Sequence, residues 1–101
     1  MESIMQGDAY SIPVCIRNGD TEILPGAVET VEIAIGSIIK KYPGEIAFSD
    51  HWMFPLTQQE TFGLTPGLQP VQVRVKFVGG EISGTNCGCV SVNASVSREV
   101  L

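Results

Sequence analysis

The sequence predicts an all-β domain, an antiparallel β-sandwich of about seven strands with at most one short helical turn. Apolar residues alternate with polar residues in several short segments, which is the period of a half-buried strand. Turn-favouring residues such as glycine, proline, asparagine and aspartate separate these segments, which recur roughly every ten residues. A small barrel is compatible with the same pattern, so the sequence leaves both all-β architectures open.

The chain has 101 residues, of which 44% are hydrophobic. A chain of this length buries only about two-thirds of the surface that its unfolded state exposes, which is enough for one core. No internal repeat, low-complexity segment or linker interrupts the sequence. We therefore expect a single domain over residues 1–101.

The first expected strand covers "YSIPVCI", residues 10–16. Ile12, Val14 and Ile16 alternate with the intervening residues and predict one buried face. Pro13 has no backbone N–H, so we place this strand at a sheet edge. An edge strand can add to the sheet of a partner protein. The expected interaction edge consists of Ile12, Pro13, Val14 and Ile16.

Four further strands are expected in the middle of the chain. They cover residues 29–36, 37–42, 45–49 and 51–56. Apolar residues two positions apart define the face that a strand turns to the core. These residues are Val31, Ile33 and Ile35 in the first segment, Ile46 and Phe48 in the third, and Trp52 and Phe54 in the fourth.

A single helical turn is expected within "PLTQQETFGL", residues 55–64. Thr57 precedes Glu60 by the spacing of a capping box, in which each side chain bonds the backbone N–H of the other residue. We expect this turn to cross between the sheets. Phe62, like Trp52 and Phe54, is expected to be a core aromatic residue.

The clearest strand is "PVQVRVKF", residues 70–77, with three valines and Phe77 on one face. Gly79-Gly80 follows and predicts a two-residue type I′ turn, in which both residues have a positive φ. Residues 81–83 are then expected to fold back antiparallel. After a bend or bulge, "CGCVSV" at residues 87–92 resumes the strand.

Several segments together resemble small proteins encoded in phages and prophages of Gram-positive bacteria. They are "MQGDAYSIPVCI", "VEIAIGSIIKKYPG", "FPLTQQETFGL", "VQVRVKFVGG" and "SREVL". Such proteins are similar in architecture to the immunoglobulin-like N-terminal domain of phage baseplate upper proteins. That domain opens with Gln-Gly-Asp followed by an alternating strand, and the matching positions here are Gln6, Gly7 and Asp8.

This resemblance implies an immunoglobulin-like sandwich that serves as a structural or protein-interaction module of a phage tail, baseplate or neck, or of its assembly. It implies partners among other virion proteins or further copies of the chain, arranged as a homo-oligomer about a symmetry axis. Because no catalytic grouping is found in the sequence, we expect no enzymatic activity and no cofactor.

Charge and composition argue against nucleic-acid and membrane partners. Six scattered Lys and Arg residues and a formal net charge of −5 argue against nucleic-acid binding. No apolar run approaches the roughly 20 residues that span a bilayer, and the first residues do not form a signal peptide. The odd number of cysteines fits a reducing compartment. We therefore expect synthesis in the cytoplasm of the bacterial host and association with the virion.

An alternative function is a small metal-binding or ligand-binding domain. The candidate ligands are Cys15, Cys87, Cys89 and His51, since zinc takes four N or S ligands. In an extended strand, however, C-x-C places the two sulfurs about 6.5 to 7 Å apart, too far for one metal unless Gly88 bends the backbone. The simpler interpretation is that these cysteines are small apolar side chains.

Strand parity predicts the direction of each thiol. If Val90 and Val92 face the core, uninterrupted alternation turns Cys87 and Cys89 outward. Either a β-bulge at Gly88 returns Cys87 to the core, or another copy of the chain or another protein covers this face. We expect the bulge for Cys87, while the position of Cys89 stays open.

The lone histidine, His51, follows Asp50 directly, which suggests a catalytic dyad. Neighbours in a strand point to opposite faces, and no nucleophile can be placed within their reach from the sequence. A turn before Trp52 explains the two residues equally well. We therefore predict no catalytic residue.

Overall fold

The computed structural model describes residues 2–101, and strands make up more than half of it. The strands are β1 (Glu2–Met5), β2 (Ser11–Val14), β3 (Arg17–Asn18), β4 (Thr21–Glu22), β5 (Val28–Ile35), β6 (Ile38–Tyr42), β7 (Ala47–Ser49), β8 (His51–Pro55), β9 (Gly67–Phe77) and β10 (Ile82–Asn93). The helical segments are a 3-10 turn, η1 (Pro25–Ala27), and an α-helix, α1 (Gln58–Phe62). The predicted all-β fold with a single short α-helix is therefore confirmed.

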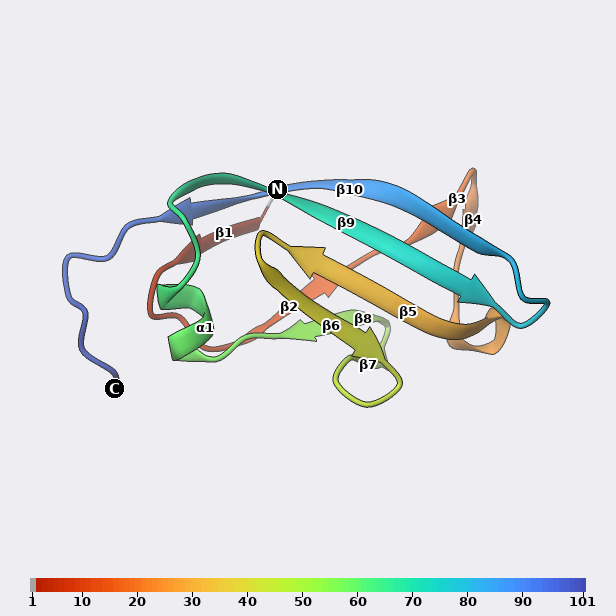
Figure 1. Cartoon of the computed structure of the whole chain (residues 1–101), viewed down its shortest axis with the longest axis horizontal. Helices are drawn as coiled ribbons and strands as arrows, with labels where there is room; N and C mark the ends of the chain where they lie inside the picture. The colour runs from red at the N-terminus through yellow and green to blue at the C-terminus, as the bar shows by residue number, and fades with distance from the viewer. Residues whose placement is uncertain (1) are drawn as a thin grey trace.

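The strands form two main sheets and a small hairpin (Figure 1). The five-stranded sheet has the order β1-β10-β9-β5-β6, and the three-stranded sheet has the order β2-β8-β7. Within residues 2–101, strands β3 and β4 pair only with each other. The molecule measures 46 × 23 × 21 Å, and the long strands β9 and β10 run along its longest axis.

Two details of the expected strand arrangement were wrong. The described residues contain ten strands rather than about seven, because β1 has four residues and β3 and β4 have two each, too few to show alternation. The arrangement is also not purely antiparallel. Strand β1 pairs in parallel with β10, from Glu2 opposite Val90 to Met5 opposite Asn93.

The core combines residues from both main sheets. Val31, Ile33 and Ile35 of β5 and Trp52 and Phe54 of β8 have no exposed surface, as their alternation predicted. The other buried apolar residues are Ile4, Ile12, Val14, Ile16, Ile23, Val28, Ile46, Leu56, Leu64, Val71, Val73, Val75, Val90 and Val92.

The prediction that Phe62 is a core residue was wrong. Phe62 lies at the end of α1, half-buried, with the Arg98 guanidinium 4.7 Å from its ring centroid. The prediction placed Phe62 with Trp52 and Phe54, which alternate on a strand. Phe62 lies on a helix, where burial does not follow a period of two.

The helical turn α1 forms as the capping box predicted. The backbone N–H of Glu60 donates to the Thr57 hydroxyl, and the Thr57 N–H donates to Glu60 Oε1. Glu60 Oε1 also accepts a hydrogen bond of 2.9 Å from Nζ of Lys40, a residue of β6 that is 9% exposed. Lys40 Nζ donates a second hydrogen bond, of 2.7 Å, to the carbonyl of Pro55. The cap therefore neutralises a buried cation between the sheets.

Burial alone raises the pKa of Glu60, but the hydrogen bonds from Lys40 and Thr57 outweigh burial and lower the pKa below its usual value. A carboxyl group whose pKa is lower in the folded chain stabilises the fold above the pKa of the unfolded chain. This contribution is lost as the pH falls through the folded-state pKa.

The variant Glu60→Gln keeps an acceptor for the cap but removes the charge beside Lys40, and we expect it to lower the free energy of unfolding at neutral pH by about 1 kcal/mol. The difference from the wild type should shrink as the pH falls through the pKa of Glu60, which urea unfolding at several pH values measures. Glu29→Gln is the control, because Glu29 makes only an exposed pair with Lys76 at 3.6 Å. An equal effect of both variants would contradict the role of Lys40.

The connection between β9 and β10 differs in detail from the prediction. The strands do form an antiparallel hairpin, but four residues, 78–81, connect β9 to β10. The Phe77 N–H donates to the Glu81 carbonyl, and the Gly80 N–H donates to the Phe77 carbonyl, each at 2.8 Å. Among the residues of this connection, only Gly80 has a positive φ, of 95°. Hairpin loops longer than two residues often contain a turn followed by one left-handed residue of this kind.

The predicted bulge at Gly88 is present. Asn86 lies opposite Gln72 and Cys89 lies opposite Pro70, so two residues of β10 face one residue of β9. Gly88 itself has a φ of +93°, which favours glycine. The extra residue shifts the alternation of side chains between the two faces of β10, so that residues before and after the bulge follow different patterns.

The variant Gly88→Ala should lower the free energy of unfolding by about 1–2 kcal/mol, because a side chain strains the left-handed backbone. Gly79→Ala is the matched control, since Gly79 lacks a positive φ and a Cβ there would meet no atom within 4 Å. Urea denaturation of both variants measures the difference. Equal stabilities would show that the bulge carries no strain.

Candidate functional site

The predicted edge strand, β2, is an outer strand of the three-stranded sheet and pairs only with β8. Ile12 and Val14 point into the core, and Pro13 is exposed. Ile16 lies beyond the end of β2, is fully buried, and accepts a hydrogen bond from the Ile23 N–H at 2.8 Å. The open edge is therefore shorter than the predicted one.

The backbone of β2 offers few donors to a partner. The Leu56 N–H donates to the Tyr10 carbonyl at 3.0 Å, which marks Tyr10, Ile12 and Val14 as the residues that face β8. Ser11 and Pro13 then direct their backbone groups outward. Because Pro13 has no N–H, the middle of this edge presents a carbonyl but no donor.

The three cysteines line one groove between β2 and β10. This groove has a volume of about 290 Å³. Its lining residues are Ile12, Pro13, Val14, Cys15, Val71, Cys87, Cys89 and Val90. The groove thus joins two sites that the sequence analysis treated separately, the β2 edge and the cysteines.

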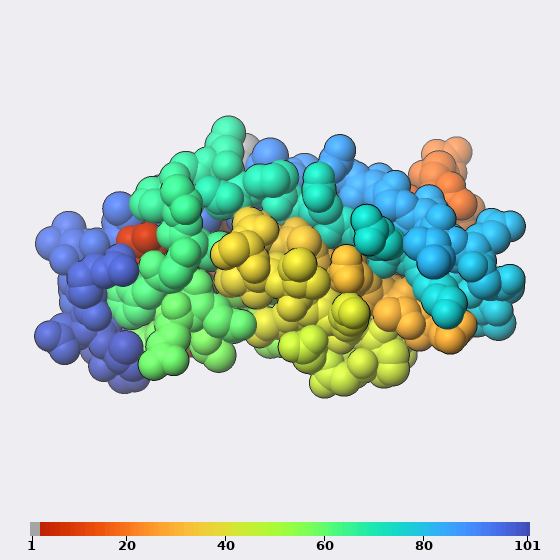
Figure 2. All heavy atoms as spheres, viewed as in Figure 1, coloured from red at the N-terminus to blue at the C-terminus, as the bar shows by residue number. Residues whose placement is uncertain are grey.

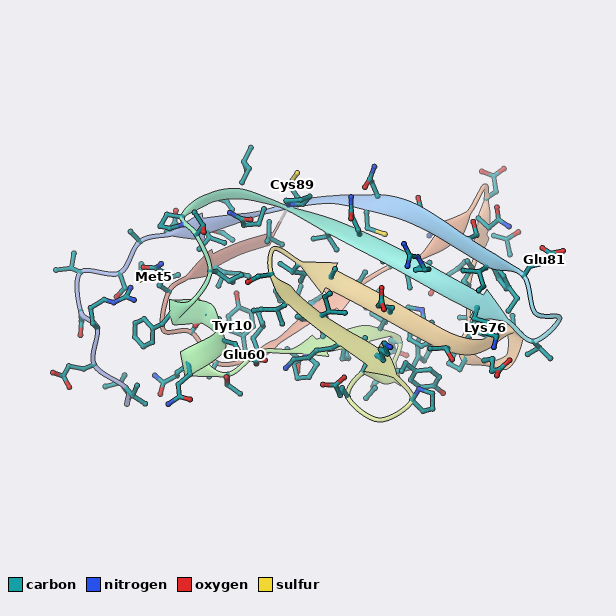
Figure 3. All side chains as sticks on the ribbon, in the orientation of Figure 1. Met5, Tyr10, Glu60, Lys76, Glu81 and Cys89 are labelled. Carbon is teal, nitrogen blue, oxygen red and sulfur yellow. The ribbon has the colours of Figure 1, made fainter. Side chains whose placement is uncertain are left out.

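The bulge returns Cys87 toward the core as expected, and the structure settles the position of Cys89, which the sequence left open. Cys87 is half-buried and packs against the core, whereas Cys89 is exposed and points away from it (Figure 3). Burial raises the pKa of the Cys87 thiol, and the nearby Cys15 raises this pKa further. A thiol with a raised pKa is mostly protonated at neutral pH, so Cys87 is a poor nucleophile and a poor metal ligand.

His51 is not among the residues that line the groove. It begins β8 and pairs with Ser49, while Asp50 between them adopts a φ of +62° in the turn. The proposed Cys₃His arrangement is not formed, since within residues 2–101 no three His, Cys, Asp or Glu side chains gather to hold a metal. The turn explains Asp50 and His51.

We expect Cys87 to be the least reactive of the three cysteines in the folded protein. Three variants, each retaining one cysteine and carrying serine at the other two positions, are treated with iodoacetamide and followed by mass spectrometry. The Cys87 variant should react most slowly, and the three rates should converge in denaturant. A fast reaction of folded Cys87 would contradict its burial.

The sequence analysis did not predict the open part of β10. Strand β1 pairs with β10 only from Val90 onward. In the described part of the chain, residues Ile82 to Cys89 therefore have β9 on one side and no strand on the other. Uneven strand lengths cause this opening, and β1 was too short to be recognised in the sequence.

The open part of β10 presents regularly spaced backbone groups. Because the Phe77 N–H donates to the Glu81 carbonyl, Glu81 directs its backbone toward β9. Alternation in an antiparallel ladder then points the N–H and C=O groups of Ile82, Gly84 and Asn86 away from β9. Within residues 2–101, no strand pairs with this row of donors and acceptors.

The residues Gln6, Gly7 and Asp8 have structural roles. Gln6 is 8% exposed and donates from Nε2 to the Leu64 carbonyl at 2.8 Å. Its Oε1 accepts hydrogen bonds from the Ser95 N–H and from Arg98 Nη1. One amide therefore ties the turn after β1 to the C-terminal segment, which spreads over one end of the molecule beside α1 (Figure 2).

The other two residues complete this turn. Gly7 has a φ of +97°, and a Cβ there would lie 2.9 Å from Cζ of Phe62. Its N–H donates to the Thr61 hydroxyl at 2.9 Å, and the Thr61 hydroxyl also lies 2.8 Å from the Asp8 carbonyl. Asp8 Oδ2 accepts from the Met5 N–H. The Gln-Gly-Asp sequence thus anchors α1.

Comparisons with protein-family models, curated proteins and solved structures found no match to this chain. Neither helical segment of residues 2–101 is long and apolar enough to cross a membrane.

Proposed function

We propose that this chain is a non-enzymatic structural or protein-interaction module of a phage or prophage virion, or of its assembly. The observation that carries the proposal is the open edge of β10. Hydrogen-bonding backbone groups that are exposed in a long strand attract a further strand, and proteins either protect such edges or use them for binding. The resemblance of the sequence to phage and prophage proteins supplies the virion context.

The strand order supports an immunoglobulin-like sandwich, the fold that this proposal includes. In the variable type of that fold, one sheet contains strands B, E and D, and the other contains G, F, C and C′. The order β2-β8-β7 corresponds to B-E-D, and the order β10-β9-β5-β6 corresponds to G-F-C-C′.

Two features distinguish the chain from antibody domains. Its three cysteines are free, so it lacks the disulfide that joins the two sheets there. Its buried tryptophan, Trp52, lies on β8, the counterpart of strand E, rather than on strand C. The nitrogen of Trp52 donates to the Ile23 carbonyl at 3.1 Å, and Tyr42 and Phe48 pack edge-on against its ring. These contacts occupy the inter-sheet space.

The proposal places synthesis in the cytoplasm of the bacterial host, followed by incorporation into the particle. Its partners are other virion proteins or further copies of the chain. The formal net charge of −5 favours a protein partner over a nucleic-acid backbone.

Virion association is tested in the strain that encodes the chain. Particles are released by prophage induction, purified on a density gradient and analysed by quantitative mass spectrometry. We expect peptides of this chain in the particle fraction at a fixed ratio to the tail proteins. Peptides that are abundant in the lysate but absent from particles at every stage of assembly would overturn the virion role.

A further inference from the structure

We propose that the open edge of β10 binds the same edge of a second copy of this chain, antiparallel and about a two-fold axis that passes through Gly84. The two five-stranded sheets then become one continuous sheet. This inference rests on the proposed function as an interaction module and names the partner of that edge.

The register of the edge is self-complementary. In an antiparallel pair, residues that point their backbone groups at each other must lie opposite one another. The outward-pointing residues are Ile82, Gly84 and Asn86, a set that is symmetric about Gly84. Gly84 of one copy therefore faces Gly84 of the other, and Ile82 faces Asn86 on both sides of the axis.

The side chains at this edge permit close approach. Gly84 has none at the axis, and Ser83 of one copy lies opposite Thr85 of the other. Opposed hydroxyl residues hydrogen-bond across paired strands. Residues 82–89, "ISGTNCGC", contain neither a charged residue nor a proline. No charge is therefore buried when the two edges meet.

Other edges of the sheets carry features that hinder pairing. Pro13 removes the middle donor of β2, and β6 carries two adjacent lysines, Lys40 and Lys41, of which Lys41 is exposed. Strand β7 has only three residues. Proline, lysine and short length are the means by which natural sheets avoid edge-to-edge pairing. The edge of β10 from Ile82 to Asn86 has none of these protections.

The extent of the pairing is limited at both ends. The connection of residues 78–81 ends it on one side. The bulge at Gly88 and the start of β1 opposite Val90 end it on the other. The contact therefore involves residues 82–86 of each copy, and longer fibres do not grow because the two-fold pairing uses this edge in both copies.

The dimer is tested by analytical ultracentrifugation of the wild type over a wide concentration range. We expect the mass to rise from 10.8 kDa toward twice that value as the concentration increases. Because each copy has a net charge of −5, added salt should strengthen the association by screening repulsion.

The edge itself is tested with Ser83→Glu, which places an exposed charge on each strand of the dimer and should abolish association. Ser49→Glu is the control, since Ser49 is also an exposed serine on a strand and lies in β7 of the other sheet. Circular dichroism verifies that both variants fold. A wild type that stays monomeric at all concentrations, or a dimer that both variants leave intact, would overturn the proposal.

The register is tested by disulfide trapping in a chain whose three native cysteines are replaced by serine. Opposed hydrogen-bonded residues have Cα atoms about 5.5 Å apart, within the range that a disulfide spans. A Cβ at Gly84 would meet only the Val73 carbonyl oxygen, at 3.6 Å. Gly84→Cys should form a covalent dimer with oxidised glutathione, and the loop control Gly79→Cys should not.

Failure of this inference is distinguishable from failure of the proposed function. A monomeric protein that is still found in purified particles would eliminate the two-fold pairing and leave the virion role. A dimer that shows the Gly84 cross-link but is absent from particles would support the two-fold pairing and eliminate the virion role.

Discussion

The bulge at Gly88 determines the direction of the side chains in the last strand, and the rest of the structure depends on that strand. Val90 and Val92 fill the core beside β1, while Cys87, on the other side of the bulge, also packs inward. Without the extra residue, one half of β10 would turn its inner face to solvent. The same strand supports β1, closes the hairpin with β9 and carries the open edge.

The two prolines of the β2–β8 pair lie where the missing backbone N–H is not needed for pairing. Pro13 and Pro55 both fall at positions of the β2–β8 pair whose backbone nitrogens point away from the partner strand. The ladder therefore loses no hydrogen bond, and the carbonyl of Pro55 accepts from Lys40 instead. On this side of the molecule a charged network joins the sheets, whereas on the β2–β10 side the sheets part around a groove lined by cysteines.

Much of this architecture could be predicted from alternation, because a strand that buries one face must repeat every two residues. This rule located β5, β8 and β9, and parity together with one glycine located the bulge. It failed for β1, β3 and β4, which are too short to show a period. The open edge of β10 could not be predicted either, because the length of the neighbouring strand β1 determines which residues of β10 stay unpaired. The groove arises from β2 and β10, which are far apart in the sequence.

The pairing of β1 with β10 and the Gln6–Arg98 hydrogen bond join residues at opposite ends of the sequence. During synthesis, β1 therefore has no partner strand until residues 90–93 have been made. The middle strands can pair earlier, because their partners lie closer in the sequence. This end of the fold is accordingly the last to form as the chain is made, and a chain terminated before Val90 would leave β1 unpaired.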